Sequence, residues 1–147
     1  MTSTGLNTFD TTVQETNHWL KAMMAYLVTD DRHGAYIALK AGLHALRDRL
    51  GPENAVHFGA QLPTLLRGVF FESWRMAATP TREHSAQAFV DHVRAHLPEN
   101  AAVDPLRATR ATFAVIADLS DPGEVAKLKR ILPDDLHTLW PDQPQTH

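Results

Sequence analysis

The 147-residue sequence contains no cysteine, only two tyrosines and only seven glycines. Without cysteine the chain can form no disulfide, no thiolate nucleophile and no cysteine-bound zinc or iron–sulfur cluster. The few glycines form no phosphate-cradling cluster, and the sequence shows no Walker loop, no G-x-S-x-G elbow and no G-x-G-x-x-G turn. The sequence therefore offers no recognisable carrier of catalysis, and we expect no catalytic residues and no bound cofactor.

Long apolar runs and an excess of positive charge are also missing. No run approaches the roughly 20 residues that a helix needs to cross a bilayer. The first ten residues lack the basic and apolar regions of a signal peptide. The net charge of -3 argues against a broad nucleic-acid-binding surface, which normally needs clustered lysine and arginine. We expect a cytoplasmic protein that binds neither a membrane nor, as its main partner, a nucleic acid.

What the sequence does contain is helical periodicity. Apolar residues recur every three or four positions, and the alternation that is typical of strands is nearly absent. Capping signals at Thr11-Thr12, Asp30-Asp31 and Asp121-Pro122 mark three helix starts. The fold class is predicted to be all-α, a compact helical bundle. Helices are expected over residues 11–27, about 30–50, 53–61, 64–71, 82–97, 106–119 and 122–132, with a short closing helix after Pro133.

A constant offset of 70 residues aligns the two halves of the chain without a gap. Leu62-Pro63 then falls on Leu132-Pro133, Pro52 on Pro122, and the apolar positions of the two halves agree in the same register. A half of this size buries too little surface to be stable alone. The sequence therefore predicts a single all-helical domain over residues 1–147, made of tandem three-to-four-helix repeats at 10–74 and 80–141. We expect the repeats to be related by a pseudo-two-fold axis.

Nine histidines are the most conspicuous chemical resource. His92 and His96 are four residues apart on a predicted helix, so they point to the same side and could hold a metal. The residue after His92 is Val93 rather than the glutamate of an H-E-x-x-H site, and no third ligand is indicated. We therefore predict no metal site, and interpret these histidines as partly exposed surface residues.

Further interpretations concern the function and the residues that could carry it. In the first repeat, the segment "GVFFESWR" extends beyond the position that corresponds to the end of the second repeat. There it either seals the junction between the repeats or exposes an aromatic patch for a partner. The favoured function is a non-catalytic protein–protein interaction or oligomerisation module with a regulatory or stress role. One alternative is a helix-turn-helix-like DNA-associated regulator, which would need a positive face around Arg47, Arg49 and Arg67. Another is a small-ligand-binding protein or enzyme that uses His33, His44 or His57 with acidic residues. The candidate partner patch consists of Arg67, Phe70, Phe71, Trp74 and Arg75.

Several stretches resemble a known family. "TDDRHGAYIALKAGLHALRDRL", "AVHFGAQLPTLLRGVFFESW" and "LPDDLHTLWP" are similar to an uncharacterised bacterial family, domain-of-unknown-function family 2267. The resemblance covers Phe9 to Pro141. It implies an all-helical bacterial cytoplasmic protein, and it brings no activity, cofactor or catalytic residue that could be carried over.

Overall fold

The computed structural model describes residues 4–142, and within this range it contains seven α-helices, two 3-10 helices and no strand. The prediction of an all-α fold is confirmed. The first half of the chain forms α1 (Asn7–Leu27), α2 (Arg32–Leu50), α3 (Pro52–Gly59) and α4 (Thr64–Phe71), followed by the 3-10 helix η1 (Met76–Ala78). The second half forms α5 (Ala86–His96), α6 (Pro105–Leu119), α7 (Pro122–Ile131) and the 3-10 helix η2 (Asp134–Leu139).

Two of the predicted helix starts are confirmed by their capping bonds. The Asp31 carboxylate accepts a hydrogen bond from the Gly34 amide at 3.0 Å, directly before α2. Asp121 accepts from the amides of Gly123 and Glu124, and Pro122 occupies the first turn of α7. Both carboxylates lie at the positive end of a helix dipole, which stabilises them there.

Two predicted boundaries are wrong. Helix α1 begins at Asn7 rather than Thr11, because the Thr4 amide donates to the Asp10 carboxylate at 2.7 Å and closes an earlier first turn. Helix α5 begins at Ala86 rather than near residue 82, because the Ser85 hydroxyl caps it by accepting from the Ala88 amide at 3.0 Å. The short closing helix after Pro133 is present, in 3-10 rather than α geometry.

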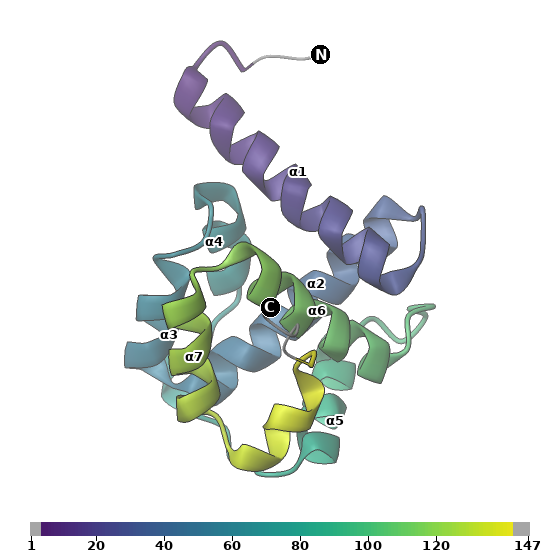
Figure 1. Cartoon of the computed structure of the whole chain (residues 1–147), viewed down its shortest axis with the longest axis vertical. Helices are drawn as coiled ribbons and strands as arrows, with labels where there is room; N and C mark the ends of the chain where they lie inside the picture. The colour runs from purple at the N-terminus through teal and green to yellow at the C-terminus, as the bar shows by residue number, and fades with distance from the viewer. Residues whose placement is uncertain (1–3, 143–147) are drawn as a thin grey trace, which may run out of the picture.

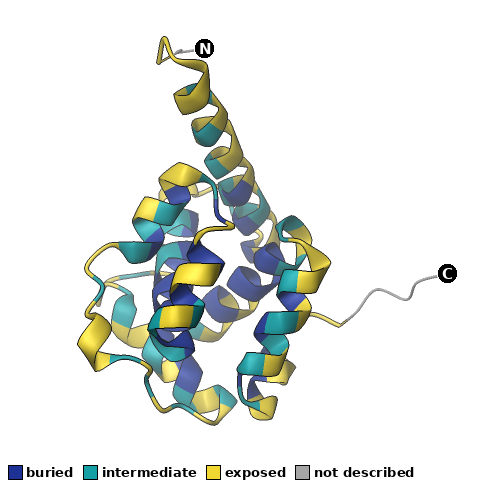
Figure 2. Cartoon of the chain, turned by 90° about the vertical axis from the view of Figure 1, so that its left-hand side faces the viewer, coloured by how far each residue is buried: buried dark blue, intermediate teal, exposed yellow. Residues whose placement is uncertain are grey.

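Helices α2 and α6 lie at the centre of the molecule, and the remaining helices pack around them (Figure 1). Helix α1 packs against α6 and α2, and α5 packs against α2 and α6. One hydrophobic core joins these elements, and Figure 2 shows its buried residues gathered in the middle of the body. The ring of Phe113 stacks on Trp140 at 4.4 Å and on Phe89 at 5.6 Å, so α6 ties α5 and η2 together.

Gly42 on α2 lies directly against α6. A Cβ atom added at this position would lie 2.2 Å from the Thr112 Oγ1 and 2.7 Å from the Thr112 Cβ. Both distances are shorter than any van der Waals contact, and Thr112 is itself fully buried. The two central helices can therefore approach this closely only because position 42 has no side chain.

The first turns of α1 extend beyond the body of the protein (Figures 1 and 2). Leu6 and Phe9 are 51% and 55% exposed there, and Val13 is also exposed. The Thr12 hydroxyl fastens this part of the helix to α4, because it accepts from the Leu65 amide at 2.9 Å. Across residues 4–142, no helix combines the length and the apolar character needed to cross a membrane.

Candidate metal centre

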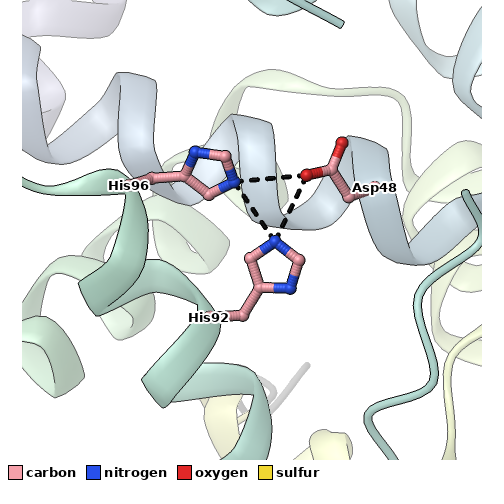
Figure 3. A group of neighbouring side chains, drawn as sticks. All are labelled: Asp48, His92 and His96. Atoms are coloured by element: carbon pink, nitrogen blue, oxygen red, sulfur yellow. Dashed lines mark hydrogen bonds and ion pairs between the residues drawn. The ribbon is translucent and has the colours of Figure 1, made fainter. Parts of the chain in front are cut away.

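Asp48, His92 and His96 converge where the last turn of α2 faces α5 (Figure 3). The His92 Nε2 and the His96 Nε2 each lie 3.2 Å from the Asp48 Oδ2. The two nitrogens are also 3.2 Å from each other, so the three atoms form a triangle with equal sides. The three side chains are 13%, 17% and 26% exposed, respectively, so the group is mostly buried but open to solvent.

The amphipathic character of α5 explains how this triangle forms. Phe89 and Val93 lie on the apolar face of α5 and are fully buried. His92 and His96 are one turn apart beside this face, so burying the apolar residues carries both imidazoles to the same edge. Because α5 packs against α2, that edge meets Asp48.

Two further side chains hold the donors in place. The Glu83 carboxylate lies 2.9 Å from the His92 Nδ1, on the opposite side of the ring from the triangle. The Arg47 Nε donates to the Asp48 Oδ1 at 2.9 Å. Arg47 is itself buried, and its Nη1 donates to the carbonyls of Phe70 at 3.0 Å and Glu72 at 2.9 Å. Partners of this kind fix the orientation of the imidazole and leave only the Asp48 Oδ2 directed into the triangle.

The charges of the cluster favour ionised groups. Burial would raise the pKa of Asp48, but hydrogen bonds from His92, His96 and Arg47 outweigh it and hold that pKa well below its usual range. The hydrogen bond to Asp48 raises the pKa of His92, against the effect of burial, and Glu83 adds to this rise. The Asp48 carboxylate is therefore anionic and would attract a metal cation placed between it and the two imidazoles.

The triangle has the dimensions of three metal ligands. An ion about 2.1 Å from each donor would lie about 1 Å out of the plane of the triangle, with donor–metal–donor angles of about 99°. This value lies between the angles of about 90° in an octahedral site and about 109° in a tetrahedral one. Within the described part of the chain, Asp48, His92 and His96 form a group whose ligand atoms all lie within 4.8 Å of one another.

The sequence indicates no third ligand for His92 and His96, and the structure places the Asp48 carboxylate beside both of them. Asp48 lies 44 and 48 residues away from them in the sequence, so no local spacing could indicate it. One signal is present in the sequence, because the 70-residue offset places Asp48 on Asp118 and thus pairs two identical residues. Both histidines are partly exposed, as expected, and both also contact the Asp48 carboxylate.

His44 lies beside the triangle, with its ring 5.6 Å from that of His96. Its Nε2 is 2.7 Å from the Val69 carbonyl, which makes the neutral ring the donor. Burial lowers the pKa of His44 to about 4, and the nearby Arg47 charge acts in the same direction. His44 is therefore occupied by a structural hydrogen bond.

The buried His44 predicts a loss of stability in mild acid. Its folded pKa of about 4 lies below the unfolded value, so the unfolded chain binds the extra proton and stability falls as the pH drops below about 6.5. We expect this residue to cost about 2 kcal/mol of unfolding free energy between pH 7.5 and pH 5. Urea unfolding at both pH values, in the presence of a chelator, measures this change in the free energy of unfolding. The control variant His44→Gln keeps a donor for the Val69 carbonyl, and its unfolding free energy should fall by about 2 kcal/mol less over the same pH range. Parallel pH profiles of the wild type and the variant would contradict the assignment of this pH dependence to His44.

The other histidines proposed for a ligand site do not join this group. His33 lies at the start of α2, where its ring contacts Tyr36, and it lines a cavity of about 740 Å³ with Asp31 and Arg107. The His57 Nε2 on α3 lies 3.2 Å from the Glu124 carboxylate. The structure therefore distributes His33, His44 and His57 over three separate environments.

The candidate partner patch is divided between core and surface. Phe70 is fully buried against Phe58 and Phe71, so it cannot contact a partner in this fold. Phe71 and Trp74 are half-buried and stack on each other at 5.4 Å, while Arg75 is exposed. These ring contacts all join residues of the first half of the chain, so they leave untested the interpretation that the aromatic residues seal the junction between the repeats.

The arginines of the DNA-binding alternative are committed to internal bonds. Arg47 is buried. Arg49 donates from Nε to the Glu83 carbonyl at 2.7 Å. Arg67 donates to the carbonyls of Gly59, Ala60 and Leu62, which satisfies the end of α3 before Pro63. The buried Arg47 cannot contribute to a positive face for phosphate contacts.

Comparison with known proteins identifies a family and supplies no activity. A search of curated proteins finds no match to the sequence. The model of one family, described as an uncharacterized conserved protein family (DUF2267), matches residues 16–139. This range includes every residue of the triangle and most of the described helices. The chain therefore belongs to the DUF2267 family.

Proposed function

We propose that this protein binds one divalent transition-metal ion through Asp48, His92 and His96, and that the ion fastens α5 to α2. The observation that carries the proposal is the triangle of ligand atoms, whose three sides are all 3.2 Å. The triangle is built from two different helices and is supported by Glu83 and Arg47. These are the features expected of a ligand set with its supporting partners.

The donor atoms indicate the class of metal. Two imidazole nitrogens and one carboxylate oxygen suit zinc and the divalent ions of cobalt, nickel, iron and manganese. Calcium and magnesium prefer oxygen ligands alone. The absence of cysteine from the sequence removes the thiolates that would favour softer ions.

Isothermal titration of the chelator-treated protein with zinc tests this proposal. We expect one equivalent to bind, with proton release from the imidazoles. His96→Ala should lower the affinity by at least about 100-fold, because it removes a ligand rather than a supporting group. Glu83→Gln should lower it by about 10-fold, because His92 loses its orienting carboxylate.

The matched control is His57→Gln. His57 is also a histidine beside a carboxylate, but the described structure brings no third ligand to it. Zinc affinity should be unchanged in this variant. Equal zinc binding by the wild type and His96→Ala would show that the metal binds elsewhere, and the proposal would then fail.

We further infer that the two halves are structural repeats, over residues 10–74 and 80–141 of a single domain. Several contacts support this inference when positions 70 residues apart are compared. Gly42 and Thr112 are such a pair, and they touch each other where α2 meets α6. The packing of α1 on α6 has its counterpart in the packing of α5 on α2.

The cluster itself has a counterpart under the same offset. His96 corresponds to Tyr26, and Asp48 corresponds to Asp118. The Tyr26 hydroxyl donates to the Asp118 carboxylate, just as His96 faces Asp48, and both contacts run between the two halves. His92 corresponds to Ala22, which has no ligand atom. The pair Tyr26 and Asp118 therefore keeps a hydrogen bond between α1 and α6, but it lacks the two imidazole donors of the cluster.

Association with a protein partner or with a second copy of the chain is a second candidate function. It is favoured by the exposed Leu6, Phe9 and Val13 on the part of α1 that extends beyond the body. Sedimentation analysis over a range of concentrations should show a mass above that of the 16.4 kDa monomer. The double variant Phe9→Ser/Val13→Ser should stay monomeric, and a monomeric wild type at every concentration would exclude self-association through this face.

A further inference from the structure

We propose that the metal at Asp48, His92 and His96 keeps solvent-facing coordination positions and binds small anionic ligands there. This inference rests on the proposed metal site and deepens it by naming the class of ligand. It starts from the number of protein donors, which the contacts around the triangle limit to three among the described residues.

Each nearby group that could act as a fourth ligand is held elsewhere. The second oxygen of Asp48, Oδ1, accepts from Arg47 at 2.9 Å, so this carboxylate offers one atom to the metal. The Glu83 carboxylate lies at the Nδ1 side of the His92 ring, away from the triangle. The His44 Nε2 is engaged by the Val69 carbonyl.

A metal held by three protein atoms differs from a purely structural one. Structural zinc sites in proteins almost always have four protein ligands, whereas sites with three keep a position for water or for an exchangeable ligand. His96 is 26% exposed and His92 is 17% exposed, so water reaches the edge of the triangle. Because the donors are mostly buried, this limited exposure favours a small ligand over a large one.

The charges around the site set the sign of that ligand. Asp48 carries a negative charge that the Arg47 guanidinium balances at 2.9 Å. Glu83 neutralises part of a divalent ion, and the remaining charge of the occupied centre is positive. A small anion that coordinates through one of its atoms, such as azide or acetate, is the chemical class that fits the charge and the limited exposure of the site.

The test uses the full chain loaded with cobalt(II), whose visible absorption reports the ligands of the ion. Cobalt uptake is measured first, and sodium azide and sodium acetate are then titrated into the loaded protein. We expect each anion to change the cobalt spectrum in a saturable way. Sodium perchlorate, which coordinates metals poorly, should leave the spectrum unchanged at the same ionic strength and thereby separates coordination from screening.

The outcomes distinguish the open coordination position from the proposed metal site on which it rests. A cobalt complex that binds with full affinity but does not respond to azide or acetate would overturn the open coordination position and leave the metal site standing. Failure of cobalt to bind would remove both. His57→Gln should show the same azide response as the wild type, and loss of the response in this variant would mean that the anion binds at another place.

Discussion

The double variant Ala22→His/Tyr26→His is expected to bind two equivalents of zinc where the wild type binds one. The two substitutions place histidines at the positions 70 residues before His92 and His96, where Asp118 already supplies the carboxylate. Helix α1 packs against α6 and α5 packs against α2. Under the proposed correspondence between the halves, the two new imidazoles would face Asp118. Titration calorimetry and metal analysis of the purified protein measure the stoichiometry.

The order of the two affinities provides the internal check. The new site lacks equivalents of the supporting Arg47 and Glu83, because Ala117 and Val13 occupy the corresponding positions. Loss of such supporting groups typically costs about 10-fold to 100-fold in affinity, so the second equivalent should bind more weakly by that factor. Adding Asp118→Ala should restore a stoichiometry of one. A single equivalent in the double variant would contradict the proposed correspondence between the halves.

Gly42→Ala is expected to destabilise the fold by about 3 kcal/mol, the upper part of the range for overpacked cores. The added methyl group would lie 2.7 Å from the Thr112 Cβ, and rotation of the Thr112 hydroxyl cannot relieve a clash with that atom. Helices α2 and α6 must then separate, which disturbs the core on both sides. Chemical denaturation at neutral pH measures the free energy of unfolding.

A double-mutant cycle isolates the cause. Thr112→Gly alone should be destabilising, because it removes a buried side chain and adds backbone freedom to α6. In the Gly42→Ala background, however, the same substitution should recover part of the lost stability by opening space for the new methyl group. Additive effects of the two substitutions would show that the contact between Gly42 and Thr112 does not limit the approach of the helices.

Much of the fold can be predicted from the sequence because its signals are local. The 3-to-4 periodicity and the carboxylate caps at Asp31 and Asp121 act within one or two helical turns. The start of α1 is harder to predict because it depends on a bond from Thr4 to Asp10, and such bonds compete with the capping boxes further along. The 3-10 character of η2 is likewise a matter of packing between elements, which periodicity does not encode.

The candidate site cannot be predicted to the same extent because it is not local. His92 and His96 show the right spacing, but their meaning depends on Asp48, which only the packing of α5 on α2 brings near. The same holds for Arg47, which resembles part of a charged surface in the sequence and is in fact buried, with its guanidinium bound to the end of α4. Charged residues on amphipathic helices are assigned to the surface by default, and tertiary contacts decide the exceptions.

The connection between the halves is held to α2 at both of its ends. At the start, Arg47 binds the Glu72 carbonyl and Lys40 binds the Glu72 carboxylate. At the end, the Thr81 amide donates to the Asp48 carbonyl at 2.9 Å, and Arg49 binds the Glu83 carbonyl. Because these bonds and the shared core hold the two halves together, we expect the covalent link to be dispensable for assembly. A chain cut once between η1 and Thr81 would keep its two pieces together. The protein could then serve as a split reporter whose fragments associate.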